Sequence, residues 1–158
     1  MRKPRLYLES TIPSYFTARP KKGGADDFWR EATVHWWNSQ IAGFDVFVSE
    51  LVREEVGGGD ADAARRRLAA IAEFPNLQIT PEVTVLANAM LSADAVPKKA
   101  GADAMHLALA AVHRMDILLT WNMRHIANPM RMGLIRAVVE MHAVPFPQII
   151  TPEYLIEI

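Results

Sequence analysis

Apolar and polar positions alternate along the chain in two kinds of block. Short runs of aliphatic and β-branched residues predict five strands, at 6–8, 45–48, 77–79, 117–120 and 148–150. Longer segments with apolar residues at the helical period predict six helices, at 26–42, 49–56, 61–73, 82–93, 102–114 and 129–142. Because strands alternate with helices, we expect crossover connections and a parallel sheet. The pattern therefore predicts an α/β fold.

Residues at the expected helix starts support these boundaries. Ser49 is a good N-cap for the second helix, and Thr80 followed by Pro81 suits the first turn of the fourth. Gly57–Gly59 can end one helix, since glycine accepts the left-handed conformation, and Asp60 can cap the next. No helix is predicted between the first strand and residue 26, so Ser10 and Thr11 are expected on a loop.

The first predicted helix has an unusually aromatic face. Its apolar positions fall on one side at a period near 3.6 residues, and they are Trp29, Ala32, Thr33, Trp36, Trp37 and Ile41. Core packing is the simpler interpretation. Two adjacent tryptophans also suit a subunit interface, which remains an alternative.

Length and composition favour one domain spanning residues 1–158. The chain is 51% hydrophobic, which allows one substantial core. It has no cysteine, so any bound metal must use oxygen or imidazole ligands. No apolar run is long enough to span a bilayer and residues 1–8 lack the features of a signal peptide, so we expect a cytoplasmic protein without membrane contact.

The formal net charge of −1 gives no general argument for nucleic-acid binding. Local basic groups would have to supply it. The candidates are Arg65–Arg67 and the scattered Arg114, Arg124, His125, Arg131 and Arg136. For the arginine triplet, a solvated helix face is the favoured interpretation.

Polar residues follow several predicted strands or begin the next helix. They are Glu9, the pair Glu54 and Glu55, Asp103, and Asn122. In open parallel sheets, ligands bind outside the carboxyl ends of the strands, where distant parts of the chain converge. These residues are therefore the candidate site.

Each acid also has a structural interpretation. Glu9, at the tip of a presumed central strand, would lose hydration unless a cation compensated it, and the alternatives are a turn cap or an arginine pair. Asp103 interacts favourably with its helix dipole, but its helix is otherwise apolar. Only one of Glu54 and Glu55 can face inward with Val52 and Val56. His106 and His113 are interpreted as packing or surface histidines.

The order of these motifs resembles a PIN domain over almost the whole chain. The pieces are Glu-Ser-Thr-Ile-Pro-Ser-Tyr at 9–15, a helix starting with Ser49 that carries a glutamate, Asp-Ala-x-His-x-Ala-x-Ala from 103, and Leu-Leu-Thr-Trp-Asn ending at 122. The first piece and Thr-Trp-Asn-Met-Arg-His-Ile-Ala-Asn at 120–128 are most similar to the VapC-like bacterial PIN proteins, which are toxins of toxin–antitoxin pairs.

The resemblance implies a three-layer α/β/α fold with about five parallel strands. It also implies a metal-dependent ribonuclease in which acids hold Mg²⁺ or Mn²⁺ and RNA is hydrolysed. By position, Glu9, Glu55 and Asp103 would be metal ligands, with Glu54 the alternative to Glu55, and Asn122 would be a fourth catalytic residue. Substrate contacts would come from Ser10, Thr11, Arg124 and His125. A toxin would further have a cognate antitoxin and form a homodimer.

Two departures from the family pattern bear on this interpretation. Glu9 replaces the usual first aspartate, and His125 stands where many members have a further acid. Three carboxylates suffice for one hard cation, so we expect one firmly bound ion and a second recruited with the substrate. The alternative is a catalytically degenerate PIN module that binds nucleic acid or a protein. A phosphoacceptor signalling domain is disfavoured because its acid pair and lysine are missing.

Overall fold

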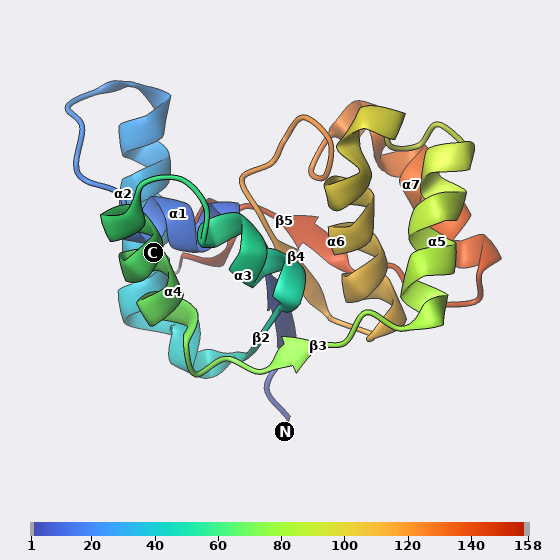
Figure 1. Cartoon of the computed structure of the whole chain (residues 1–158), viewed down its shortest axis with the longest axis horizontal. Coiled ribbons are helices and arrows are strands. Elements are labelled where there is room, and N and C mark those ends of the chain that lie inside the picture. Colours follow the sequence, from blue (N-terminus) through green and yellow to red (C-terminus); the bar gives the residue numbers. More distant parts are fainter. Residues whose placement is uncertain (1, 157–158) are drawn as a thin grey trace.

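A computed structural model describes residues 2–156 and shows a five-stranded parallel sheet between two groups of helices (Figure 1). The strands are β1 (Arg5–Leu8), β2 (Asp45–Ser49), β3 (Asn76–Leu77), β4 (Ile117–Leu119) and β5 (Gln148–Ile150). Their order in the sheet is β3-β2-β1-β4-β5, and every neighbouring pair is parallel. The three-layer α/β/α prediction is confirmed, and β1 is the central strand.

The centre of the sheet is the centre of the core. Leu6, Tyr7 and Leu8 of β1 are all fully buried, as are Leu118 and Leu119 of β4. Such continuous apolar runs are typical of parallel strands, which are covered on both faces. The central position of β1 brings the residue that follows it, Glu9, to the middle of one sheet edge.

Within residues 2–156, seven α-helices cover the sheet. They are α1 (Thr11–Thr17), α2 (Gly24–Gln40), α3 (Glu50–Val56), α4 (Ala61–Ile71), α5 (Pro81–Ser92), α6 (Gly101–Val112) and α7 (Pro129–Met141). Figure 1 shows α1 to α4 grouped on one side and α5 to α7 on the other. Short 3₁₀ turns lie at Ile41–Gly43, Lys98–Ala100 and Pro152–Leu155. Among residues 2–156, no helix is long and apolar enough to cross a bilayer.

The predicted helix caps are confirmed. The side chains of Ser49, Asp60 and Thr80 each accept a hydrogen bond from the backbone N–H three residues later. Gly59 has a φ of 77°, which explains the glycine at this turn between α3 and α4. These local contacts fix the entry of α3, and therefore the direction from which Glu55 reaches the sheet edge.

The prediction of a loop after β1 is wrong, because residues 11–17 form helix α1. Pro13 is compatible with this helix because it lies in the first turn, where its missing N–H costs no helical hydrogen bond. The helix starts directly after Glu9 and Ser10. Both side chains are therefore fixed between a strand end and a helix start.

The aromatic face of α2 packs inside this chain. Trp36 is fully buried, Trp29 stacks on Trp121 with ring centroids 5.4 Å apart, and Trp37 stacks on Phe16 at 4.1 Å. Aromatic pairs of this kind add to the stabilisation from burial alone. Core packing, the simpler of the two interpretations, therefore accounts for this face.

Candidate metal site

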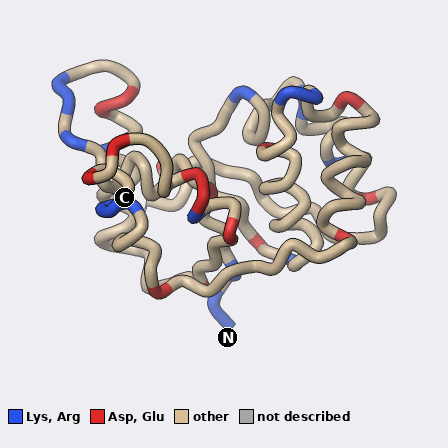
Figure 2. The backbone as a smooth tube through the Cα atoms, viewed as in Figure 1, with Lys and Arg blue, Asp and Glu red and all other residues tan. Residues whose placement is uncertain are grey.

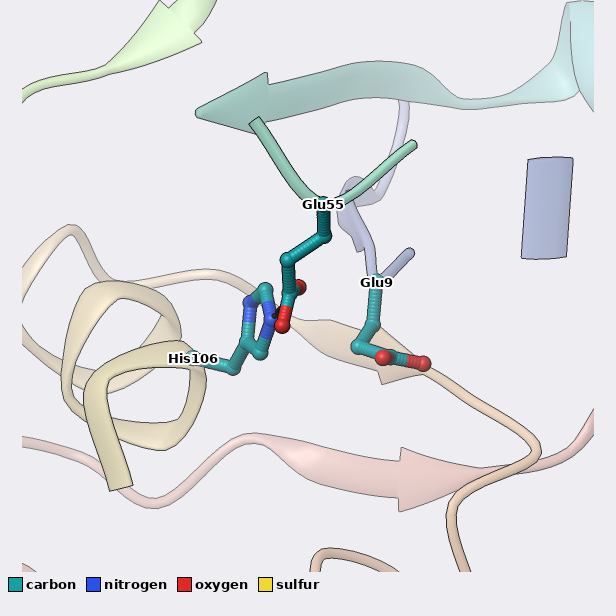
Figure 3. A group of neighbouring side chains, drawn as sticks. All are labelled: Glu9, Glu55 and His106. Atoms are coloured by element: carbon teal, nitrogen blue, oxygen red, sulfur yellow. Dashed lines mark hydrogen bonds and ion pairs between the residues drawn. The ribbon is translucent and has the colours of Figure 1, made fainter. Parts of the chain in front are cut away.

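Three side chains from different elements meet at the carboxyl edge of the sheet. Glu9 follows β1, Glu55 lies near the end of α3, and His106 lies on α6. One potential ligand atom from each lies within 4.8 Å of the others, so this group could hold a metal ion (Figure 3). The sequence predicted Glu9, Glu55 and Asp103 as the metal ligands. The structure brings Glu9 and Glu55 together with His106, whereas Asp103 lies outside this group of three.

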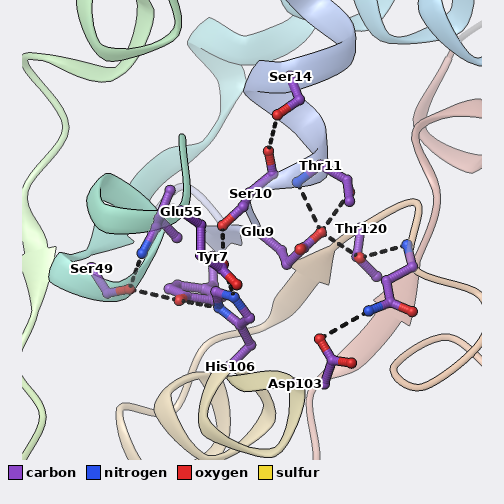
Figure 4. A network of polar contacts seen from close by, with 12 residues as sticks. Tyr7, Glu9, Ser10, Thr11, Ser14, Ser49, Glu55, Asp103, His106 and Thr120 are labelled. Atoms are coloured by element: carbon purple, nitrogen blue, oxygen red, sulfur yellow. Dashed lines mark hydrogen bonds and ion pairs between the residues drawn. The ribbon is translucent and has the colours of Figure 1, made fainter. Parts of the chain in front are cut away.

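One oxygen of Glu9 is held by three hydrogen bonds (Figure 4). Oε1 accepts from the Thr11 backbone N–H at 3.1 Å, from the Thr11 hydroxyl, and from the Thr120 hydroxyl at 2.6 Å. Both hydroxyls are oriented in turn, because Thr11 Oγ1 accepts the N–H of Trp121 and Thr120 Oγ1 accepts the N–H of Asn122, each at 2.9 Å. The carboxylate is therefore fixed by partners from α1 and from the segment after β4.

The other oxygen of Glu9, Oε2, accepts no hydrogen bond from residues 2–156. Glu9 is only 3% exposed, and in this same part of the chain no lysine or arginine pairs with it. Oε2 is not among the buried side-chain atoms of residues 2–156 that lack a partner, so it keeps some contact with solvent, and a cation can reach it there. An oxygen ligand of this kind suits a hard divalent cation such as Mg²⁺ or Mn²⁺.

Glu55 shows the same half-saturated pattern. Its Oε1 lies 2.5 Å from the donating Ser10 hydroxyl and 2.6 Å from His106 Nε2, while Oε2 has no hydrogen bond within residues 2–156. Partial burial by itself would raise the pKa of Glu55, but the contact with His106 and the hydrogen bond from Ser10 outweigh it and lower the pKa. Glu55 is therefore an ionised acceptor. Glu54 and Glu55 are both exposed residues, but only the Glu55 carboxylate contacts Ser10 and His106 within residues 2–156, so Glu55 is the glutamate that belongs to the group.

His106 is fully buried and has polar partners at both ring nitrogens. Its Nδ1 lies 2.7 Å from the Tyr7 hydroxyl, which lies 2.8 Å from the Ser49 hydroxyl. Burial raises the pKa of Tyr7 well above its ordinary value, so the phenol stays protonated. The sequence interpretation of His106 as a packing or surface residue missed these contacts. Its position three residues after Asp103, on the same helix face, was the available signal.

Asp103 and Asn122 form a second pair beside this group. Asn122 Nδ2 donates to Asp103 Oδ1 at 3.0 Å, and the Asn122 backbone N–H reaches the Thr120 hydroxyl that holds Glu9 (Figure 4). Asp103 is thus linked to Glu9 through hydrogen bonds, although it lies outside the compact group of three. Hydrogen bonds therefore join three of the four residues predicted as catalytic, Glu9, Asn122 and Asp103. The fourth, Glu55, is bonded to His106 in a separate set of contacts, and a ligand atom of each lies within 4.8 Å of Glu9.

The predicted substrate contacts divide into two kinds. The hydroxyls of Ser10 and Thr11 donate to Glu55 and Glu9, so in this structure they hold the acids. The side chains of Arg124 and His125 make no hydrogen bond or ion pair with the rest of residues 2–156, and the His125 backbone N–H donates to Asn122. The second pair therefore keeps its side-chain donors available for a phosphate.

The arginine triplet is engaged within its own region. Arg65 and Arg66 pair with Asp62, and Arg67 donates to the carbonyls of Val56 and Gly58. Figure 2 shows lysines and arginines spread over both helix groups. These contacts support the structural interpretation of the triplet.

Ser10, Glu55 and His106 include the residue types of a serine hydrolase, but their order differs. The carboxylate lies between the hydroxyl and the imidazole, and it accepts from both. A nucleophilic serine needs the imidazole beside its own hydroxyl to remove the proton. The contacts therefore favour acid positioning over nucleophile activation.

Comparison of the chain with known protein families and with curated protein sequences gives no match.

Proposed function

We propose that this chain is a metal-dependent endoribonuclease of the PIN-domain kind. The observation that carries the proposal is the buried Glu9 carboxylate, which has three donors on Oε1 and none on Oε2 within residues 2–156. A second carboxylate with the same pattern, Glu55, lies beside it. Convergent oxygen ligands at the carboxyl edge of a parallel sheet are a common arrangement for a bound divalent cation.

In this proposal, Glu9 and Glu55 hold one Mg²⁺ or Mn²⁺ ion, and Asp103 is the third acid of the site. When bound, the ion neutralises charge on the scissile phosphate and favours ionisation of the attacking water. Asn122 holds Asp103 through its amide. Arg124 and His125 have the free donors needed to bind phosphate oxygens.

The reaction is a hydrolysis without a covalent enzyme intermediate. The water oxygen forms a bond to phosphorus, and the bond from phosphorus to the 3′ oxygen breaks in line with it. The proton lost by the water is balanced by one gained at the 3′ oxygen. The products carry a 5′-phosphate and a 3′-hydroxyl, which distinguishes this route from attack by the ribose 2′-hydroxyl.

The resemblance to VapC-like proteins extends the proposal to a toxin with a cognate antitoxin and a homodimeric assembly. A short DNA-binding protein encoded beside this chain that abolishes its activity when co-expressed would support it. A neighbouring gene of another kind would favour a nuclease that acts without an antitoxin. Neither outcome changes the chemistry proposed for the site.

The decisive test is cleavage of a structured RNA by the purified protein with Mn²⁺ or Mg²⁺. We expect Asp103→Asn to reduce the rate by at least about 100-fold, because it removes an acid next to the ion. Asp94→Asn is the matched control, since Asp94 is exposed and has a φ of 56° that asparagine tolerates. Products with 5′-phosphates and inhibition by EDTA are expected.

Equal, metal-independent cleavage by the wild type and Asp103→Asn would overturn the nuclease proposal. RNA binding without cleavage in either metal would instead support the degenerate PIN module. The features that favour that second candidate are Glu9 in place of the usual first aspartate, and Asn122 and His125 where a fourth acid would stand.

A further inference from the structure

We propose that Tyr7 and His106 form a positioning pair, in which the Tyr7 hydroxyl fixes the His106 tautomer that holds Glu55. This inference rests on the proposed function, because it gives these residues a role in metal binding. It assigns His106 as a positioning residue and not as a metal ligand. The site would then bind its ion through carboxylate oxygens.

The assignment follows from counting the protons in a buried chain of contacts. The Val52 N–H donates to Ser49 Oγ, so the Ser49 hydroxyl is free to donate to Tyr7 Oη. The Tyr7 hydroxyl then donates to His106 Nδ1. The single proton of a neutral imidazole must therefore be on Nε2, where it is donated to the Glu55 carboxylate.

The opposite direction leaves groups unsatisfied. If Nδ1 donated to Tyr7, the Tyr7 hydroxyl would donate to Ser49, and the fully buried Ser49 proton would have no acceptor among the contacts of residues 2–156. With a neutral ring, the lone pair of Nε2 would also face the Glu55 oxygen at 2.6 Å. Both consequences are unfavourable in a buried site. The forward direction gives every proton an acceptor.

This tautomer determines what the site offers a cation. Nε2 carries a proton and so cannot be a ligand, and the hydrogen bond to Oε1 of Glu55 leaves Oε2 free. Outer residues that orient ligands in this way commonly change metal affinity by about 10–100-fold. Carboxylate oxygens without imidazole favour Mg²⁺ and Mn²⁺ over Zn²⁺.

The tautomer can be read directly in the metal-free protein by ¹⁵N NMR of the imidazole nitrogens. We expect a protonated Nε2 and an unprotonated Nδ1 for His106 in the wild type. Tyr7→Phe removes the donor and should convert part of the population to the other forms. Tyr15→Phe is the control, because it also removes a tyrosine hydroxyl bond, here to the exposed Asp26. A protonated Nδ1 in the wild type would overturn the assignment.

The metal role is tested by Mn²⁺ binding, followed by electron paramagnetic resonance. We expect about 10-fold weaker binding in Tyr7→Phe and no change in Tyr15→Phe. Spin-echo spectra of bound Mn²⁺ should lack the coupling of a directly bound imidazole nitrogen. His106→Gln can keep an N–H near the Nε2 position, so it should bind Mn²⁺ more tightly than His106→Leu, with circular dichroism confirming that both are folded.

The outcomes separate this inference from the proposed function. A directly bound nitrogen, or equal Mn²⁺ affinity of Tyr7→Phe and the wild type, would overturn the positioning role while leaving the nuclease proposal intact. Wild-type protein that binds no Mn²⁺ would overturn the metal-dependent function, and the metal role of the pair with it, even if NMR shows the expected tautomer.

Discussion

Acidic residues at the two ends of the sheet differ in their partners and in their exposure. At the amino end, Asp116 precedes β4 and is held by the Arg2 guanidinium at 2.8 Å and by the Arg5 backbone N–H at 2.8 Å. Its side chain is still 38% exposed. At the carboxyl end, Glu9 is 3% exposed and has no cationic partner within residues 2–156. The more deeply buried acid is therefore the one without a cation from the chain.

This difference separates an acid that an arginine of the chain compensates from one that, in the proposed function, a bound cation would compensate. Hydration would compensate much of the charge of Asp116 even without Arg2. Glu9 has little access to water, and the chain supplies hydroxyls and an N–H on one oxygen only. Functional sites often retain such locally unfavourable arrangements at a cost in stability. The predictions below test whether the two ends differ in this way.

The largest effect should come from adding the cation. At a Mn²⁺ concentration 100 times its dissociation constant, the free energy of unfolding of the wild type should rise by about 2.7 kcal/mol. Glu9→Gln should lose most of this gain, whereas Asp116→Asn should keep it. Urea denaturation with and without Mn²⁺ measures both. Equal gains in the two variants would mean that Mn²⁺ binds elsewhere.

A smaller effect of opposite sign is expected without metal. Glu9→Gln should raise the free energy of unfolding by about 1 kcal/mol, because it removes repulsion between two carboxylates whose oxygens lie within 4.8 Å. The glutamine carbonyl can still accept from Thr11 and Thr120. Thermal denaturation in EDTA provides the measurement. A clear loss of stability would show that the Glu9 charge is already compensated in the metal-free chain.

The smallest effect is expected at the amino end. The hydrogen bonds from the Arg2 guanidinium and the Arg5 backbone N–H lower the pKa of Asp116. They therefore stabilise the fold fully at pH values above the ordinary pKa of aspartate, and this stabilisation is lost as the pH falls through the lowered pKa of Asp116. Asp116→Asn should therefore lower Tm by less than about 3 °C at neutral pH. Its difference from the wild type should vanish in strong acid. A difference that persists there would point to a cause other than ionisation.

Much of the fold follows from local patterns in the sequence. The five strands and six of the helices were predicted near their observed positions, because parallel strands are short apolar runs and the helices have clear periods and caps. Helix α1 was missed because the helix is short and contains Pro13.

The site was predictable where position along the chain determines position in space. Glu9 lies at a strand tip, and the inward face of α3 left only Glu54 or Glu55. The choice of Glu55, and the involvement of His106, depend on contacts between residues about 50 and 100 positions apart in the sequence, such as those from His106 to Glu55 and Tyr7. Periodicity places His106 on the buried face of α6. Periodicity does not reveal that the Tyr7 hydroxyl contacts His106 on this face.

The partners that hold Glu9 also determine when the candidate metal site can form in a nascent chain. Thr120 follows Glu9 by 111 residues, and its hydroxyl reaches the carboxylate only after β4 has paired with β1. During translation, Glu9 and Glu55 emerge from the ribosome long before this pairing is possible. A partly synthesised chain therefore lacks the arrangement that fixes Glu9. The candidate site can form only when synthesis of the sheet is nearly complete.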